Sequence, residues 1–433
     1  MNAIILGLVF GLAAASPALA ADAAMPTKAP AKTATTTSSD GIWQFTYNED
    51  TRYFSWTSTR GYPNTVTIPV LPVRAPGSGS QLYVPVGMQL VGRPNDNYKV
   101  EFLSRSGYVS SRQSTPGANG DVSTTTDTSV TGKVTYLGLD GAHPFVSLAV
   151  NAPTGKSALY GNAAFARLDS DLVDLATFGE GWNLGPTAGV TLALADNAVM
   201  SLGLGYTNRG PYNREGAIDP VTLFQGTTHI DPGDQITPNV TLGARNGSLV
   251  VQGSLSYVME TVTRLDGADF YRSGPRYIAA LAAAYDWTES FSSTFTGQFA
   301  HSGRNKVAML GVSELVTEAF DSNSNIYKAI LDLTYKQGNL SIGPTGSFLF
   351  RDHNAWSSTA FQFLPAKTRW SAGGAAGYAV SKEITVNARV ERFWAHENDN
   401  PQKMAEDLKI GNSAVPAISS NAWLFTLGGL ARF

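Results

Sequence analysis

The sequence predicts an all-β protein: a transmembrane, antiparallel, up-and-down β-barrel of about 14–16 strands, with short periplasmic turns and long extracellular loops. Three observations indicate this fold. Segments of about 10–13 residues alternate between apolar and polar positions, which is the pattern of strands with one apolar face and the length of a tilted membrane crossing. Short polar turns and long segments alternate as the connections between them. The segment Asn421–Phe433 repeats the pattern and ends on an aromatic residue.

The segment Asn421–Phe433 also predicts that the sheet closes into a barrel. One of its faces carries Trp423, Phe425 and Leu427. An open sheet ending in such a strand would leave an edge that promotes aggregation, whereas a barrel pairs the last strand with the first. The segment resembles the C-terminal strand of Gram-negative outer-membrane barrels, and the resemblance implies a barrel of that kind.

Composition narrows the class of protein. The chain has 433 residues, 43 Gly, no Cys, 15% charged residues and a net charge of -3. The absence of Cys excludes a disulfide framework and thiolate chemistry. The balanced charge gives no basic patch for nucleic acid. Beyond the first twenty residues, no apolar run approaches the roughly 18 residues that a membrane helix needs.

The chain divides into four parts. Residues 1–20 are expected to be a signal peptide, with an apolar core at Ile4–Ala15 and a small-residue cleavage site. Residues 21–40 have the Ala, Thr, Pro and Lys composition of a flexible periplasmic linker. Residues 41–80 are either the first strands or a plug; Ile42–Tyr47 and Thr51–Thr57 are expected to form a hairpin, and Thr65–Leu71 another strand. Residues 81–433 are expected to form the barrel.

Within that barrel the alternating segments pair across short polar turns. Asn246-Gly247 is the strongest hairpin signal among these turns. The expected strand pairs are Leu82–Leu90 with the segment from Tyr98, Val130–Leu139 with Pro144–Ala152, Asn183–Ala195 with Ala198–Arg209, Gln235–Arg245 with Ser248–Glu260, Arg276–Trp287 with Ser290–Ser302, Ile326–Lys336 with Leu340–Arg351, and Ala366–Val380 with Ile384–Ala395. A soluble periplasmic β-sandwich or β-propeller also has many short strands and is the alternative fold. The propeller is disfavoured, because no motif recurs at a period of roughly 40–50 residues.

The position of charge separates the lipid face from the lumen. In Ile326–Lys336, Tyr327 and Leu331 share one face and Lys328 and Asp332 the other. A charge on the lipid face at mid-depth costs roughly 2–4 kcal/mol, so the charged face is expected to line the lumen. The residues expected to line the pore on this basis are Lys99, Glu101, Arg105, Lys133, Arg209, Arg245, Glu260, Lys328, Asp332, Lys336, Arg351, Lys367, Arg369, Arg389 and Glu391. Arg392 shares a face with Trp394 and is expected to snorkel to the interface.

No motif for a cofactor, a catalytic centre or a metal stands out. Thr154-Gly155-Lys156-Ser157 lacks the first glycine of a phosphate loop, because Val150 occupies that position. The run from Asp321 to Asn325 opens like a calcium loop, but the required glycine and closing glutamate are missing. Asp169, Asp171 and Asp174 are read either as a cation site or, more simply, as a solvated loop face.

Two dipeptides, each with one histidine beside a serine or an aspartate, leave an enzyme as a minor alternative. His301-Ser302 and Asp352-His353 lie at the loop ends of expected strands, where a rim hydrolase would place them. Five histidines are scattered along the chain, and such adjacency is expected by chance. The prediction is therefore that the protein is not an enzyme.

One stretch carries a family resemblance. Ser147–Thr207 contains VNAPTGK at 150–156 and FGEGWNLGPTAG at 178–189. It resembles an outer-membrane transporter family of phenol-degradation (MetA) pathways, related to FadL-like channels for hydrophobic molecules. The asparagine-proline-alanine hatch motif of FadL channels is missing. The resemblance implies a barrel used for uptake and assigns no individual binding residue.

The leading hypothesis is an exported outer-membrane channel for passive diffusion of small solutes. A lumen with more Lys and Arg than Asp and Glu either fills the barrel with ion pairs or forms a wet pathway that mildly favours anionic or polar solutes. The alternatives are a structural or surface-interaction barrel with a blocked lumen, and the rim hydrolase. The expected partners are outer-membrane lipid and an unnamed solute, with no nucleic acid; a homo-oligomer stays open.

Overall fold

The computed structural model describes residues 43–59, 76–115, 118–173, 175–218, 225–309, 311–358, 360, 362–400 and 417–433. The signal peptide expected over residues 1–20, the linker expected over residues 21–40 and the strand expected over Thr65–Leu71 lie outside these ranges. No helix in the described part of the chain is long and apolar enough to cross a membrane.

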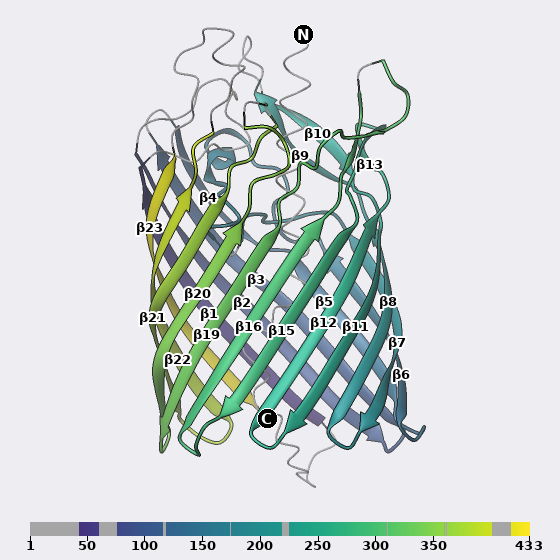
Figure 1. Ribbon diagram of the computed structural model, residues 1–433, viewed down its shortest axis with the longest axis vertical. Coiled ribbons are helices and arrows are strands. Elements are labelled where there is room, and N and C mark those ends of the chain that lie inside the picture. The colour runs from purple at the N-terminus through teal and green to yellow at the C-terminus, as the bar shows by residue number, and fades with distance from the viewer. Residues whose placement is uncertain are drawn as a thin grey trace.

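Sixteen antiparallel strands close into one barrel (Figure 1), which confirms the predicted fold class. In order around the wall they are β1 (Trp43–Ser58), β2 (Gly77–Asn95), β3 (Tyr98–Thr115), β5 (Thr128–Tyr136), β6 (Ala142–Ala152), β7 (Asn183–Ala195), β8 (Ala198–Arg209), β11 (Gln235–Asn246), β12 (Leu249–Glu260), β15 (Arg276–Asp286), β16 (Phe291–Ser302), β19 (Ile326–Gln337), β20 (Leu340–Arg351), β21 (Lys367–Ala379), β22 (Ile384–Glu397) and β23 (Ile418–Arg432).

Closure joins the first described strand to the last. β1 pairs with β2 on one side and with β23 on the other. At the turn end of the barrel, Phe45 and Phe433 exchange both backbone hydrogen bonds at 2.8 Å. Among the described residues, every strand of the barrel wall therefore has a partner on both sides, as lipid requires of a β structure. At the predicted Asn246-Gly247 turn, Gly247 has φ +55, a backbone conformation that glycine adopts without steric cost.

One expectation about local structure was wrong. Trp43–Ser58 is one continuous strand, and the expected hairpin around Asn48-Glu49-Asp50 does not form. These polar residues resemble a turn in the sequence, but Asn48 and Asp50 share the lumen-facing parity of Phe54, where a barrel strand accepts polar residues. Glu49 lies on the opposite parity and accepts a hydrogen bond from the Thr51 hydroxyl at 2.6 Å. The long connections contain short strands of their own. β4 (Ala118–Thr125) extends the pairing of β3, and a second sheet at the loop end contains β9 (Tyr212–Ile218), β10 (Gln225–Asp231), β13 (Thr263–Leu265), β14 (Ala268–Arg272), β17 (Lys306–Val307) and β18 (Val316–Thr317).

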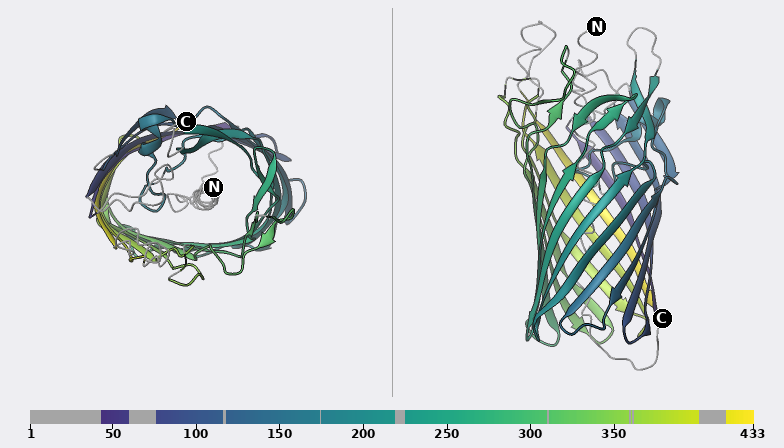
Figure 2. Two further views of the ribbon diagram at one scale, coloured as in Figure 1. Left: turned by 90° about the horizontal axis from the view of Figure 1, so that it is seen from above. Right: turned by 90° about the vertical axis from the view of Figure 1, so that its right-hand side faces the viewer.

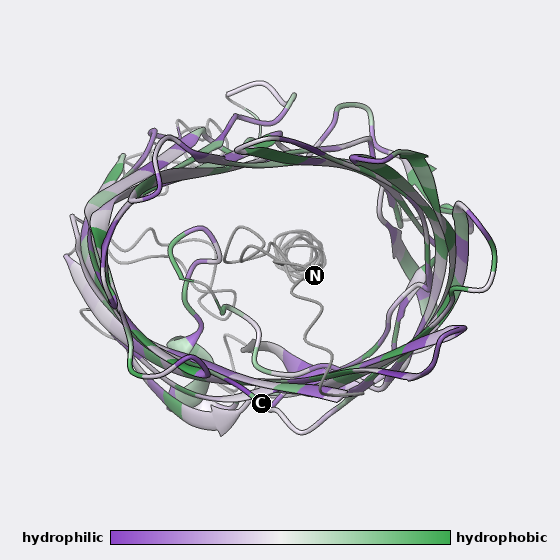
Figure 3. Cartoon of the chain, turned by 90° about the horizontal axis from the view of Figure 1, so that it is seen from below, coloured by the Kyte–Doolittle hydropathy of each residue, from purple (hydrophilic) through white to green (hydrophobic). Residues whose placement is uncertain are grey.

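The outer face of the wall is apolar. On β19, Tyr327, Leu331 and Tyr335 are exposed, as are large apolar residues on the matching parity of the other strands. Figure 3 shows that the strands of the wall carry both hydrophilic and hydrophobic residues all around the ring. Trp370 and Trp394 stack 4.3 Å apart on this face, and the Arg392 guanidinium lies 5.0 Å from the Trp423 ring. Such a surface is stable in contact with lipid and its interface.

Candidate functional site: a loop folded inside the barrel

The connection between β6 and β7, residues 153–182, folds against the inner wall and is called the inner loop below. Figure 2 shows this blue segment within the ring of strands when the barrel is seen from above. It contains one short 3₁₀ helix, η1 (Gly161–Ala166). Its residues reach strands β1, β3, β20, β21 and β22, which surround a large part of the lumen.

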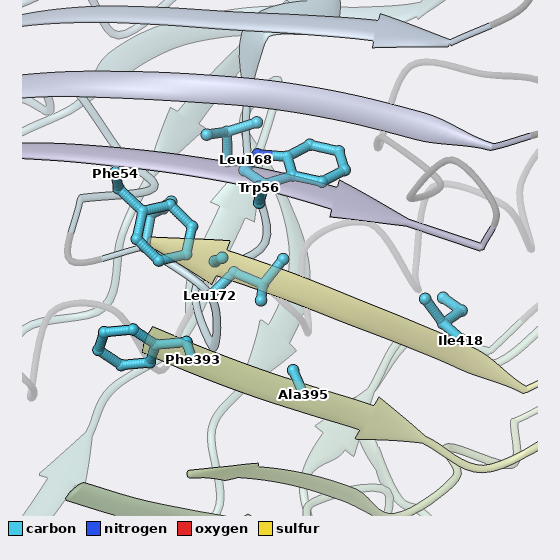
Figure 4. Packing of buried hydrophobic residues seen from close by; sticks show 9 residues of the cluster. Phe54, Trp56, Leu168, Leu172, Phe393, Ala395 and Ile418 are labelled. Atoms are coloured by element: carbon cyan, nitrogen blue, oxygen red, sulfur yellow. The ribbon is translucent and has the colours of Figure 1, made fainter. Parts of the chain in front are cut away.

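Two apolar contacts hold the inner loop on the wall. Leu168 and Leu172 pack against Phe54, Trp56 and Phe393 of β1 and β22, as Figure 4 shows. A second buried group contains Leu159, Ala164, Ala166 and Phe178 of the loop with Val109 of β3 and Val122 of β4. The wall residues of both groups lie on the parity opposite to the exposed apolar belt. The loop is therefore inside the barrel.

A buried ion cluster fixes the same loop to β20, β21 and β22; we call Asp169, Asp171, Arg351, Lys367 and Glu397 the latch. Lys367 Nζ lies 2.5 Å from Asp169, 3.4 Å from Asp171 and 2.9 Å from Glu397. Arg351 lies 2.8 Å from Asp171. Burial opposes the charged form of Asp171, but Arg351 and Lys367 outweigh it and hold its pKa well below the usual range. Removing one member would leave buried charge without compensation.

The two ends of the inner loop meet in a neck. A Cβ on Gly155 would lie 1.9 Å from the Phe178 carbonyl oxygen, and a Cβ on Gly179 would lie 2.7 Å from the Gly155 carbonyl carbon, so both positions require glycine. Asp127, which precedes β5, accepts hydrogen bonds from the backbone N–H groups of Gly155 and Glu180 at 2.9 and 2.8 Å. The neck makes the loop a compact unit with adjoining ends.

Glu180 lies in the neck, where its carboxylate is buried and its negative charge is only weakly compensated. Its Oε2 lies 3.9 Å from Arg209, too far for a hydrogen bond. Burial raises the pKa of Glu180 to about 7; the Arg209 charge opposes this shift, and the Asp127 charge adds to it. Arg209 is shared between two carboxylates, because it also lies 3.9 Å from Glu260 of β12.

The neck is therefore expected to be more stable at pH 5 than at pH 8. The pKa of Glu180 rises from 4.5 to about 7 on folding. The folded protein thus binds more protons in this range, and stability falls as the pH rises through it. Protection of residues 153–182 in hydrogen exchange should show this difference, and Glu180→Gln should remove it. The exposed Glu314→Gln is the control; equal pH dependence in wild type and Glu180→Gln would contradict the assignment.

The structure distributes the predicted pore-lining residues over three levels of the barrel. Those near the loop end are bound to the inner loop or its neck: Arg351, Lys367, Arg369, Arg209 and Glu260. Those at the middle form two networks or face inward beside them: Lys99, Glu101, Lys133, Arg105, Lys328, Asp332, Arg389 and Glu391. Arg245 and Lys336 lie at the turn end.

The middle networks show which way these side chains point. Arg389 of β22 lies 3.3 Å from Asp332 of β19 and 2.6 Å from Glu391. Two strands separate β19 from β22, and side chains that far apart converge only on the concave side of a curved wall. On β3 and β5, Glu101 lies 2.9 Å from Lys99 and 3.6 Å from Lys133. The described charged residues at the middle of the lumen are therefore largely paired.

The environment of Asp169 and Asp171 differs from both interpretations of the sequence. Asp169 and Asp171 contact Lys367 and Arg351, so neither reading given to them, a cation site or a solvated face, describes their environment. Their partners are distant in sequence, and the nearby Leu168, Leu172 and Val173 were the signal that this loop is buried. Among the described residues, no group of His, Asp or Glu is arranged to hold a metal.

The histidines considered for a rim hydrolase have other partners. His301 Nδ1 lies 2.7 Å from Asn325 Oδ1, and His353 Nδ1 lies 2.7 Å from the carbonyl oxygen of Asn354. The ring of His301 also stacks on Tyr277. Neither ring bonds a serine hydroxyl or a carboxylate within the described ranges. His301 and His353 therefore form no Ser-His or Asp-His pair with the described residues, whereas His396 Nδ1 lies 3.0 Å from the Ser419 hydroxyl oxygen.

No family model matches the sequence, and a search of curated proteins finds no match. Among solved structures, the chain is similar to the outer membrane channel DcaP of Acinetobacter baumannii, with 11% identity over 90% of this chain and 97% of that chain and a TM-score of 0.40. A FadL homologue of Pseudomonas aeruginosa has 11% identity over 90% and 89%, with a TM-score of 0.42. An outer membrane channel from Pseudomonas putida F1 has 12% identity over 90% and 95%, with a TM-score of 0.34.

The closed wall and its apolar belt define a transmembrane β-barrel of the outer-membrane type. The resemblance to the phenol-degradation transporter family stays a prediction.

Proposed function

We propose that the protein is an outer-membrane channel for passive diffusion of small solutes. The observation that carries this proposal is the partial exposure of charged side chains inside a closed wall. Asp332 keeps 33% and Lys133 37% of its side chain exposed. A close-packed interior would cover them. Solvent-accessible space therefore lies beside these groups, and a barrel of this strand number is wide enough for it.

In this proposal the inner loop is the constriction. It covers the inner faces of β1, β3, β20, β21 and β22 near the loop end and leaves the paired charges of the middle level exposed. Leu159 and Phe178 of the inner loop are each only 1% exposed, so the loop packs tightly inside the barrel. This tight packing favours the second candidate function, a structural or surface-interaction barrel with a blocked lumen. Conductance separates the two candidates.

Planar-bilayer recordings of the wild-type protein are expected to show conductance steps with a mild preference for anions. On β3 and β5, Lys99 and Lys133 face a single carboxylate, Glu101, which leaves an excess of positive charge. Lys133→Glu should therefore move the reversal potential in a salt gradient toward cation selectivity. Lys382→Glu, in the exposed turn between β21 and β22, is the matched control.

A membrane that stays sealed at every voltage would contradict the channel and support the blocked barrel. A reversal potential that shifts equally in Lys133→Glu and Lys382→Glu would show that the lumen charge does not select ions. The fold of each variant is checked by the shift in gel mobility between unheated and boiled samples.

A further inference from the structure

Among the described strands, one arginine on the outer face of the wall has no carboxylate beside it. Arg392 of β22 faces outward, paired with Ala372 of β21 and Trp423 of β23. The outward positions of β21, β22 and β23 carry no Asp, Glu or Lys and no second Arg. The two carboxylates of β22, Glu391 and Glu397, face the lumen, where each forms an ion pair. Along these three strands, the positive charge of Arg392 is therefore not compensated on its own side of the wall.

Arg392 lies among aromatic rings near the loop end of the lipid-facing surface. Its guanidinium is 5.0 Å from the centre of the Trp423 ring, and Trp394, two residues further toward the loop end, stacks on Trp370 at 4.3 Å. On the turn side, the exposed Val390 precedes it on the same face of β22. Tryptophans gather at the membrane–water interface, where a charge on the lipid face costs much less than at mid-depth. The guanidinium is therefore expected at the depth of the lipid headgroups.

Toward the loop end, the outer face of the neighbouring strands is polar; we call it the hydroxyl face. It begins on the paired strands β3 and β4, whose outward side chains are Ser110, Arg112, Ser114, Asn119, Asp121 and Ser123. Arg112 and Asp121 pair at 3.2 Å, so the face carries no net charge there. A row of cross-strand partners, Ser114, Ser78, Thr57 and Asn421, continues the face across β2, β1 and β23 to Trp394 of β22. The hydroxyl face and Arg392 therefore belong to one continuous outer surface.

We propose that this surface binds a phosphorylated glycolipid of the outer leaflet, the class to which lipopolysaccharide belongs. A guanidinium binds a phosphate through paired, charge-assisted hydrogen bonds, and Arg392 supplies it at headgroup depth. The apolar face below Arg392 suits acyl chains, and the hydroxyl face offers donors and acceptors to sugar hydroxyls. A phospholipid could use Arg392 but has no sugars for the hydroxyl face. The inference concerns the outer surface and does not depend on conduction through the lumen.

The test uses the full chain in detergent and measures bound lipid by native mass spectrometry over a titration. The probes are a lipopolysaccharide with core sugars, its lipid A part alone, and phosphatidylglycerol. The lipopolysaccharide is expected to bind most tightly, because it can use Arg392 and the whole hydroxyl face. Phosphatidylglycerol should bind about tenfold or more weakly, because it lacks the hydrogen bonds of the sugars. Lipid A should lie between the two.

Arg392→Gln is expected to weaken the binding of lipopolysaccharide and of lipid A about tenfold or more, because both carry the phosphate. Arg264→Gln is the matched control and should bind like wild type, since Arg264 is an exposed arginine of β13 in the second sheet. Ser110→Ala with Ser123→Ala removes two outward hydroxyls that lie 3.1 Å apart. This double variant should weaken lipopolysaccharide binding severalfold and leave lipid A binding unchanged. Unheated gel mobility shows that each variant is folded.

Unchanged lipopolysaccharide binding in Arg392→Gln, or an equal loss in Arg392→Gln and Arg264→Gln, would overturn the proposal. Equal binding of lipopolysaccharide and phosphatidylglycerol by the wild type would overturn the choice of a glycolipid, as would an unchanged affinity in the double serine variant. Binding with the expected pattern in a protein that never conducts would support the glycolipid surface and overturn the channel. Conductance without selective lipid binding would do the reverse.

Discussion

Excision of residues 156–178 should raise the single-channel conductance severalfold. The inner loop lies inside the wall and covers the inner faces of strands from β20 around to β3. The neck makes the excision feasible, because Gly155 and Gly179 are already in contact and can be joined directly. Conductance in planar bilayers is the measurement, and the unheated gel mobility shows whether the barrel still closes.

A double substitution, which disturbs the inner loop less than its excision, tests the latch. Asp169→Asn with Asp171→Asn removes both loop carboxylates that contact Lys367 and leaves the apolar contacts of Leu168 and Leu172 in place. We expect intermediate conductance with frequent transitions between levels. Arg245→Gln at the turn end is the control. If excision leaves conductance unchanged, another part of the chain forms the constriction.

Leu331→Arg should destabilise the barrel by about 2–4 kcal/mol, because it places a charge in lipid at mid-depth. Leu331 lies on the outer face of β19 and is 48% exposed. The neighbouring Ile330 has the opposite parity and pairs with Thr296 and Ser347, which face the lumen. Ile330→Arg is therefore the matched control and should cost much less.

Urea unfolding in lipid vesicles measures both variants against wild type. Equal losses at positions 330 and 331 would mean that the assignment of lipid and lumen faces is wrong. The charged side chains would then not line a water-filled lumen, and the proposed channel would be excluded.

The alternation of single residues made most of the wall predictable. Gln235–Arg245 was expected as a strand and β11 covers Gln235–Asn246, because lipid and water impose opposite demands on successive side chains. The same rule failed at Asn48-Glu49-Asp50, where a polar run inside β1 imitates a turn.

The inner loop could not be predicted in the same way. Its contacts follow no local period, and the Lys367–Asp169 pair joins residues 198 positions apart. A charged residue in a sequence does not reveal which distant charge will meet it. Parity alone therefore predicts the pore-lining residues, whereas the partners that neutralise Arg351 and Lys367 follow only from the three-dimensional structure.

The bond between the first and last strands has a consequence for biogenesis. Thr46 pairs with Arg432, so this seam is the most sequence-distant contact in the wall. Hairpins between neighbouring strands can form early, but the seam must wait until nearly the whole polypeptide has been gathered, since bringing distant segments together carries a growing entropic cost. Until then β1 and β23 remain open templates for pairing with other chains, and a cell that makes this protein has to shield them on the way to the membrane.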